Sequence, residues 1–428
     1  MSFGTYIYEI RRLMAIRRYQ NKFRFKNSSI AEHEWSVACI AMGLGLWQSK
    51  YSDVKVDMGE LLQRALLHDS IKLFTGDMQS SPRNKALMSV AFSEVKEILF
   101  ETNFKQMLPQ NWQESFKRFV LYAKDDSVEG KIVRASNVID KILECVEEIE
   151  LGNKRMFEDV IKLQAEELID IDIDVSHWFL AYCLEDLGFR DIKKYYGEKV
   201  DRFIKTYRKT NKTNFSDFED TFGVYLYQIR DLMRTMRYQN LNKLMPRSVA
   251  QHEWSVSRIA MGLAYLENLK FGSNINMYDL LSTTLVHDTP EYITGDVLSY
   301  VKRTTPRMLE AVEKREEEAF DNEIAYLLPE EWKTEFRLKM LYPKNSTPEG
   351  KVVAAADTMD TILECIEEIK IGNTEHFSDI LLKSTEKLTE MDMPSVKYFL
   401  KHSLPDFGLE IKTYYGDRVH SYIKSLHI

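Results

Sequence analysis

Apolar residues recur along this chain at intervals of three and four positions, which is the spacing of one face of an α-helix. One segment shows the pattern with steps of four, three and three between its apolar residues Val37, Ala41, Leu44 and Trp47. Helix breakers are scarce, since the 428 residues include only 17 Gly and 10 Pro. The pattern therefore predicts an all-α protein.

Residues that cap helices precede several of the apolar segments. Two capping boxes of the form S-x-x-E/Q are present, at Ser29 to Glu32 and at Ser248 to Gln251. We expect His33 and His252 to lie in the first turn or so of the helices that begin there. Further helix starts are predicted at Asp57 with Glu60, at Asn276 with Asp279, and at Thr347 followed by Pro348.

The first half of the chain returns in the second half. The segment FGTYIYEIRRLMAIRRYQN begins at Phe3 and FGVYLYQIRDLMRTMRYQN begins at Phe222, an offset of 222 − 3 = 219. Later segments keep this offset or one of 220, as ILECVEEIELGN and ILECIEEIKIGN do. A repeat of this length is a duplicated domain rather than a solenoid unit. We predict a domain at residues 1–208, a polar linker at 209–220 and a second domain at 221–428.

Charge and cysteine content narrow the class of protein. The net charge of −8 and the pI near 5.8 argue against a general nucleic-acid or anionic-membrane binder. We find neither a signal peptide nor a segment that approaches about 18 uninterrupted apolar residues. The four Cys form no C-x-x-C pair, and Cys145 and Cys365 lie on apolar helix faces, which favours buried free thiols. We expect a cytoplasmic protein that does not contact membranes.

Histidine and aspartate recur in both halves with the same spacing. Each half has an early His and a later His-Asp pair, separated by 68 − 33 = 35 and 287 − 252 = 35 residues. In the second half Asp357 follows an apolar VVAAA run, where an unpaired carboxylate would be costly to bury. Two imidazoles and two carboxylates from three helices suit one divalent transition metal, with Mn, Co, Fe and Zn all open.

The order H…HD…D, with HD-x-x-E-x-x-T-G-D after the second His, resembles the HD superfamily and most closely the YfbR-like 5'-deoxynucleotidases. The resemblance covers nearly the whole of each half. It includes an Arg followed by an aromatic residue, at Arg18-Tyr19 and at Arg237-Tyr238. It implies two tandem HD-domain helical bundles. It also implies that one metal is held by His252, His287, Asp288 and Asp357.

The same resemblance implies roles for further residues of the second half. Glu291 is similar to the residue that orients or deprotonates the attacking water, and acts together with Asp288. Asp296 is similar to a residue that contacts the nucleotide sugar. Arg237 is similar to a phosphate or sugar contact, and Tyr238 to the residue that shapes a pocket for deoxyribose.

The first half departs from the family pattern at two positions. Asn137 stands where the second half has Asp357, and Lys72 stands where it has Glu291. Asn removes one negative charge, and Lys adds a positive one that repels a cation and cannot act as a base. His33, His68 and Asp69 remain, and we expect weak metal binding or none.

Asp140 is a possible substitute ligand in the first half, because it lies three residues after Asn137 on the same helix face. Its counterpart Asp360 is present beside an intact Asp357, however, so a shared structural or sugar-contacting role explains both residues more simply.

The leading hypothesis is a metal-dependent 5'-deoxynucleotidase that releases phosphate from deoxynucleoside monophosphates, with the second half catalytic and the first structural or regulatory. One alternative is a deoxynucleoside triphosphate hydrolase, and another is a nucleotide-sensing protein with little catalysis. The two halves are expected to form a pseudo-dimer within one chain, and further homo-oligomers remain open. The sequence leaves open the base preference, the native metal and the number of phosphates.

Two charged segments carry no predicted site. One basic stretch is interpreted as a solvated helix surface and consists of Arg11, Arg12, Arg17, Arg18, Lys22, Arg24 and Lys26. Arg237, the counterpart of Arg18 in the second half, is excepted from this interpretation. The acidic runs ECVEEIE and ECIEEIK are interpreted as exposed helix faces. The histidines outside the repeat receive no role: His177, His376, His402, His420 and His427.

Overall fold

The computed structural model describes residues 3–77, 85–211, 221–297, 299–302 and 304–427. Within these residues all regular structure is helical, apart from two isolated β-bridges, so the all-α prediction is confirmed. The α-helices described in the first half are α1 (Phe3–Ile10), α2 (Ile30–Tyr51), α3 (Met58–Leu67), α4 (Lys72–Thr75), α5 (Lys85–Leu99), α6 (Gln113–Leu121), α7 (Val128–Glu150), α8 (Lys154–Ile169), α9 (Asp174–Tyr182), α10 (Ile192–Tyr196) and α11 (Glu198–Thr210).

The second half repeats this order, except that α16 has no counterpart among the described helices of the first half and α22 covers the positions of both α10 and α11. Its α-helices are α12 (Phe222–Gln228), α13 (Val249–Lys270), α14 (Met277–Thr284), α15 (Glu291–Thr294), α16 (Ser299–Lys302), α17 (Pro306–Ala319), α18 (Glu330–Leu341), α19 (Pro348–Lys370), α20 (Phe377–Thr389), α21 (Pro394–Tyr398) and α22 (Ile411–Ser425). Residues 212–220 of the predicted linker lie outside the described residues, and α11 extends to Thr210.

The predicted helix starts are confirmed by side-chain caps. Ser29 and Ser248 each form a complete capping box at the start of α2 and α13. Thr347 caps α19, and Pro348 occupies its first turn. Because these caps fix where α2, α13 and α19 begin, they also fix which residues of each helix face the centre of each half.

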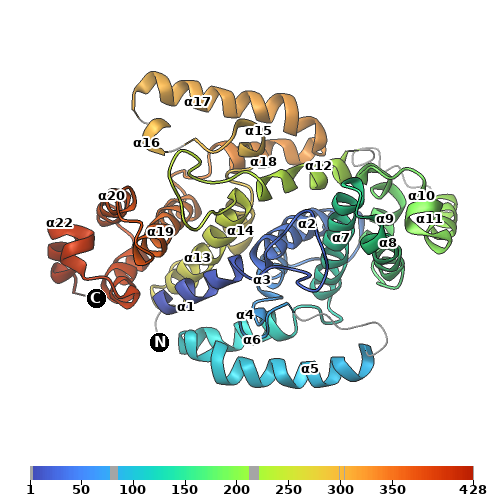
Figure 1. The fold of residues 1–428 in the computed structure, drawn as a ribbon, viewed down its shortest axis with the longest axis horizontal. Helices are drawn as coiled ribbons and strands as arrows, with labels where there is room; N and C mark the ends of the chain where they lie inside the picture. Colours follow the sequence, from blue (N-terminus) through green and yellow to red (C-terminus); the bar gives the residue numbers. More distant parts are fainter. Residues whose placement is uncertain (1–2, 78–84, 212–220, 298, 303, 428) are drawn as a thin grey trace.

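The two halves pack along their central helices. α2 packs against α13, and α3 packs against α14. Figure 1 shows these helices in the middle of the molecule, with α5 and α6 along one edge and α17 and α18 along the opposite edge. Buried apolar side chains of both halves belong to one continuous core. The halves are therefore not separate bodies joined by a linker.

The N-terminal helix of each half packs on the other half. α1 contacts α13 and the short turns η10 (Phe399–Ser403) and η11 (Leu404–Phe407), as Figure 1 shows for α13. A Cβ on Gly262 of α13 would stand 2.3 Å from the Phe3 ring, so only glycine admits that ring. α12 makes the corresponding contact with η6 (Glu185–Leu187) of the first half. The two halves thus exchange their first helices.

The interpretation of the charged segments as exposed surface is wrong for much of their length, although Arg12 and Arg17 are exposed. Arg11 and Arg18 of the basic stretch are buried, and so are Glu144 and Glu148 of the first acidic run. Arg18 pairs with Glu144 at 2.9 Å, and the backbone N–H groups of residues 25 and 26 donate to Glu148. Because opposite charges and hydrogen-bond donors meet inside the fold, these groups can be buried without remaining unpaired.

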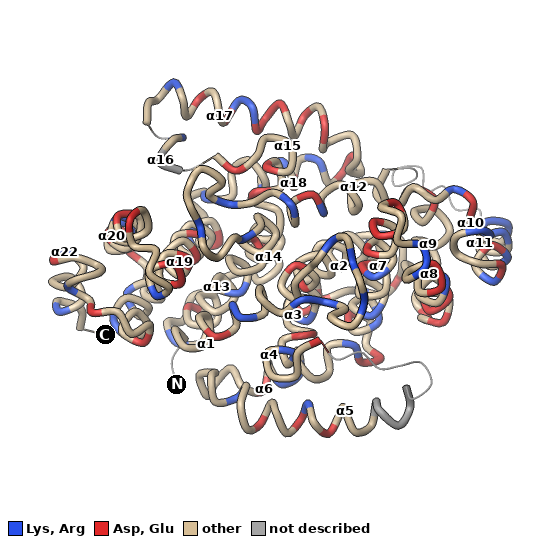
Figure 2. Tube along the Cα trace, in the orientation of Figure 1, with Lys and Arg blue, Asp and Glu red and all other residues tan. Residues whose placement is uncertain are grey.

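Figure 2 shows both signs of charge interspersed along outer helices such as α11 and α17.

All four cysteines are free and buried, as expected for Cys145 and Cys365. In the described part of the chain, each helix falls short of the length and apolar content that membrane crossing requires.

Candidate metal centre

The four predicted metal ligands of the second half converge. His252 comes from the first turns of α13, His287 and Asp288 from the turn after α14, and Asp357 from α19. His252 Nε2 lies 3.3 Å from Asp288 Oδ2 and 3.2 Å from Asp357 Oδ1, and His287 Nε2 lies 3.5 Å from Asp288 Oδ2. We call these four residues the second-half site.

His287 is held as a neutral ligand. Its Nδ1 lies 2.9 Å from the carbonyl oxygen of Thr284, so Nδ1–H donates there and Nε2 keeps its lone pair. That Nε2 is buried and has no hydrogen-bond partner in the described residues. Burial lowers the pKa of His287, which favours the neutral ring. A buried, unpartnered acceptor that points at two carboxylates is what a metal site requires.

His252 is oriented by a carboxylate behind it. Its Nδ1 lies 2.6 Å from Asp360 Oδ2, so Nδ1–H donates to Asp360 and Nε2 faces Asp288 and Asp357. Burial and Arg237 lower the pKa of His252, but its contacts with the three carboxylates raise it well above the usual range. The raised pKa favours a second proton on the His252 ring, at Nε2, in the metal-free protein. A cation would replace that proton.

The donor set fits a divalent transition metal. Two imidazole nitrogens and two carboxylate oxygens, separated by 3.2 to 3.5 Å where they approach, can surround one ion whose bonds are about 2.0–2.2 Å long. The three ligands His252, His287 and Asp288 offer their atoms within 4.8 Å of one another. Asp360 supplies the carboxylate that typically supports a metal-bound histidine.

Two lysines that the sequence did not single out reach the site. Lys344 Nζ lies 2.7 Å from Asp357 Oδ2, and Lys302 Nζ lies 3.8 Å from Glu291. Although burial alone would raise it, the pKa of Asp357 is held well below its usual range by Lys344 and His252. Lys344 precedes the cap of α19 and Lys302 ends α16, so neither shared a motif with the ligands.

Glu291 is buried at the start of α15, next to the ligands. Burial and the nearby carboxylates of Asp288 and Asp296 raise its pKa well above the usual range. A carboxyl with a raised pKa beside a candidate metal is a typical acid–base group.

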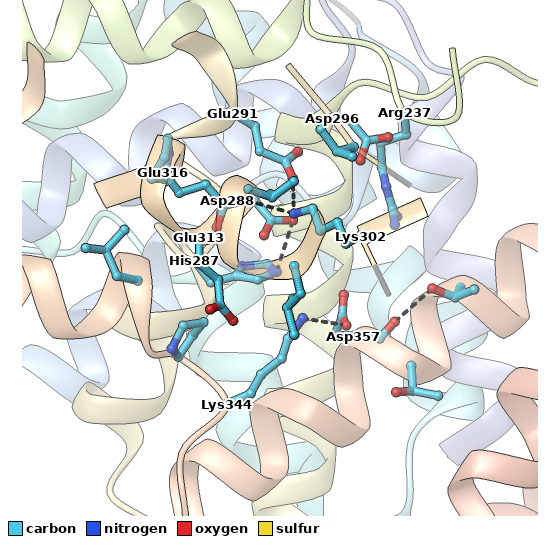
Figure 3. Close-up of a pocket in the computed structure, with 18 of the residues that line it drawn as sticks. Arg237, His287, Asp288, Glu291, Asp296, Lys302, Glu313, Glu316, Lys344 and Asp357 are labelled. Carbon is cyan, nitrogen blue, oxygen red and sulfur yellow. Dashed lines mark hydrogen bonds and ion pairs between the residues drawn. The ribbon is translucent and has the colours of Figure 1, made fainter. Parts of the chain in front are cut away.

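A cavity of about 710 Å³ opens over the ligands. Figure 3 shows His287, Asp288 and Asp357 among the lining side chains, with Glu291 above them, Lys302 beside Asp288 and Lys344 reaching Asp357 from below. α20 closes another side with Ile380, Lys383, Ser384 and Lys387. The volume is within the usual range for small-molecule sites.

Arg237, Tyr238 and Asp296 also line this cavity, so the predicted substrate contacts lie in one place. Arg237 is ion-paired with Asp360 at 3.0 Å and Glu364 at 3.1 Å. Tyr238 has a left-handed backbone, with φ of 56°, and its N–H donates to Asp296 at 2.8 Å. Asp296 therefore holds the turn that places the tyrosine at the cavity.

The first half brings His33, His68 and Asp69 together in the same way. Lys72 Nζ, however, lies 2.8 Å from Asp69 Oδ2, the oxygen that also lies 3.4 Å from His33 Nε2. Burial alone would raise the pKa of Asp69, but Lys72 holds it well below the usual range. Asn137 Oδ1 lies 3.2 Å from His33 Nε2. The ammonium group of Lys72 thus occupies the oxygen that faces His33, whereas Lys344 in the second half contacts Asp357 Oδ2 and leaves Oδ1 facing His252.

Asp140 does not replace the lost ligand in this structure. Its Oδ2 lies 2.6 Å from His33 Nδ1, on the side of the ring away from Asn137. Asp360 has the same relation to His252. The shared supporting role that the repeat suggested for these two aspartates agrees with this geometry.

Each ligand cluster is also tied to the opposite half. Glu253 accepts the N–H of Asp288 at 2.9 Å and the indole N–H of Trp35, from the first half, at 2.7 Å. Glu34 likewise accepts the N–H of Asp69 at 3.0 Å and the indole N–H of Trp254 at 2.9 Å. The backbone that carries each ligand aspartate is therefore fixed by both halves.

An all-helical fold that brings an early His and a His-Asp pair together in each half is the arrangement of HD-domain hydrolases, and the comparisons with known proteins agree. The family model described as 5'-deoxynucleotidase YfbR-like matches residues 5–187 and again residues 224–407. The chain therefore belongs to the YfbR-like family and contains two copies of its domain.

Several curated proteins are similar to this chain over one copy of the domain. A 5'-deoxynucleotidase of Vibrio vulnificus is 30% identical over 175 residues, which are 41% of this chain and 89% of that protein. One from Photorhabdus laumondii is 30% identical over 180 residues, 42% of this chain and 86% of its own. Among solved structures, an HD-domain phosphohydrolase from Listeria innocua is 31% identical and has a TM-score of 0.43. It covers 47% of this chain and 97% of its own.

Proposed function

We propose that the protein is a metal-dependent 5'-deoxynucleotidase that releases phosphate from deoxynucleoside monophosphates, with catalysis in the second half. One observation carries the proposal. In the second half, three of the four predicted ligands and the buried Glu291 line one cavity, and His252 lies buried against Asp288 and Asp357, whereas the first half has Lys72 and Asn137 at the matching positions. The names of the similar proteins support the choice of substrate.

His252, His287, Asp288 and Asp357 would hold the metal. A bound divalent cation polarises phosphoryl oxygens and lowers the pKa of water. Glu291 is placed to take a proton from the attacking water, because it is buried beside Asp288 and faces the cavity. The water oxygen bonds to phosphorus as the bond from phosphorus to the 5' oxygen breaks, and the leaving oxygen takes up a proton.

Lysines around the cavity supply charge for the phosphate group. Lys302, Lys344 and Lys383 line it from three different helices or loops. Their ammonium groups bind the phosphate dianion and stabilise the charge that it carries during transfer. Arg237 is paired with two carboxylates at once, those of Asp360 and Glu364, and is less exposed than Lys302 or Lys344, so we assign it to holding the site and to the sugar side rather than to the phosphate.

Acidic residues on α17 favour a monophosphate over a triphosphate. Glu313 and Glu316 line the cavity, and Figure 3 shows Glu313 beside His287 and Glu316 near Asp288. Glu316 accepts a hydrogen bond from Lys302 at 2.8 Å, so the charge of this lysine is already partly neutralised. Two further phosphates would add negative charge next to these carboxylates, at a cost in free energy.

The test is phosphate release from matched deoxy- and ribonucleoside mono- and triphosphates with added Mn²⁺ or Co²⁺. We expect release from deoxynucleoside monophosphates, almost none after chelation, and little from the triphosphates. A Glu291→Gln variant should retain the metal and lose the activity, because it keeps the shape of the side chain without the base. Release of equal amounts from triphosphates would contradict the proposed substrate.

A further inference from the structure

We propose that Arg11, a residue of the first half, is a positioning residue for the metal site of the second half. The inference deepens the proposed function, because it assigns part of that site to the half without a complete ligand set. It rests on a chain of contacts from Arg11 through Asp360 to His252.

Arg11 is carried into the second half by the exchanged N-terminal helix. It begins the short turn η1 (Arg11–Met14) directly after α1, which packs on α13. Its side chain is 1% exposed. It donates to Ser255 Oγ at 2.7 Å, to Glu367 Oε1 at 2.9 Å, and to Asp360 Oδ1. All three acceptors belong to the second half.

Asp360 divides its two oxygens between Arg11 and the metal ligand. Oδ1 contacts Arg11, and Oδ2 accepts from His252 Nδ1 at 2.6 Å and from Arg237 at 3.0 Å. The contact with Arg11 therefore sets the rotation of the carboxylate, and the carboxylate sets the His252 ring. With Nδ1–H donated to Asp360, Nε2 lies 3.2 Å from Asp357 and 3.3 Å from Asp288.

The first half contains the equivalent network, in which an arginine of the second half contacts residues of the first half. This equivalent network supplies a matched control. Arg230, in η7 (Ile229–Met233) of the second half, reaches back to Asp140 Oδ1 and to Ser36 Oγ, the latter at 2.9 Å. Asp140 Oδ2 lies 2.6 Å from His33 Nδ1. Arg230 is as buried as Arg11, at 1% exposure, but its network ends beside Lys72 and Asn137.

The comparison separates positioning from folding. If both arginines only stabilise the contact between halves, Arg11→Met and Arg230→Met should have equal effects on every property. If Arg11 positions His252, both variants should lower the thermal midpoint by similar amounts, and only Arg11→Met should weaken metal binding. An outer-shell partner of a metal-bound histidine is typically worth about 10- to 100-fold in metal affinity.

The experiment is a Co²⁺ titration of the full chain without substrate, followed by absorption, with Asp357→Asn identifying the signal of the second-half site. We expect Arg11→Met to weaken Co²⁺ binding by about 10- to 100-fold and Arg230→Met to leave it near the wild-type value. Arg11→Lys should restore part of the affinity, and it keeps the test usable if Arg11→Met does not fold. Arg230→Lys is its control.

Equal Co²⁺ affinities in the Arg11 and Arg230 variants would overturn the inference. The substrate-free titration also separates this result from the proposed function. Weakened Co²⁺ binding in Arg11→Met, with no phosphate released by the wild type, would uphold the positioning role and reject the activity. Phosphate release by the wild type with unchanged Co²⁺ affinity in Arg11→Met would do the reverse.

Discussion

The two ligand clusters of this chain have nearly the same frame and opposite electrostatics. In both, the early His contacts an Asp behind it at 2.6 Å and lies near the Asp of the His-Asp pair, at 3.3 Å in the second half and 3.4 Å in the first. At the centre, the second half has Asp357 and Glu291, and the first has Asn137 and Lys72. The comparison teaches that a metal site can lose its charge balance while its supporting hydrogen bonds persist.

Making the second-half site resemble the first should have the largest effect. Asp357→Asn removes one ligand charge, and we expect it to lower phosphate release by about a thousandfold or more, about 4 kcal/mol of transition-state stabilisation. The measurement is phosphate release with saturating Mn²⁺, together with bound metal per chain. Asn137→Asp is the matched control and should change activity little by itself.

The reverse exchange should create a second metal site. Lys72→Glu combined with Asn137→Asp removes the ammonium group beside Asp69 and restores the carboxylates, so bound metal should rise from about one to about two ions per chain. Metal analysis after dialysis measures this directly. If the wild type already holds two ions, the distinction between the halves is wrong.

Metal binding to the second half should weaken as the pH falls. Contacts with three carboxylates raise the pKa of His252, so a proton occupies the ring below that pKa and must leave before the ring can bind a metal. The Co²⁺ affinity should therefore rise about tenfold per pH unit for each proton released while the pH is below that raised pKa, and level off above it. An affinity that does not depend on pH would show that His252 is neutral in the metal-free protein.

Helix caps should show the smallest effect and no difference between the halves. Thr347 caps α19 and Ser127 caps α7, each by accepting a backbone N–H in the first turn. Thr347→Ala and Ser127→Ala should each cost about 1 kcal/mol of unfolding free energy, measured by urea denaturation. Activity at a temperature well below unfolding should stay near the wild-type value in both.

Local sequence signals predicted the helices well, and the residues predicted as ligands lie close together. The capping boxes at Ser29 and Ser248 placed His33 and His252 correctly, because capping depends on residues within one turn. The repeat then identified Asp357 and its counterpart Asn137 before any geometry was known. These features depend only on near neighbours or on the comparison of the two halves.

The errors came from contacts between residues far apart in the sequence, some within one half and some between the halves. Arg11 was interpreted as surface because a charged helix face is usually solvated, and nothing near it in the sequence reveals that Asp360 and Glu367 cover it. Lys302 and Lys344 were missed for a related reason, because each reaches the site from outside the ligand motifs. Periodicity shows which side of a helix is polar, but not what covers that side.

Joining the two halves in one chain also changes what a single mutation can do. In a symmetric pair of identical chains, a codon change at the position of Asn137 would alter both sites at once and remove all activity. Here α1 and α12 still cross between the halves, yet each residue of each half is encoded separately. One site could therefore drift while its scaffold stayed under selection to support the other.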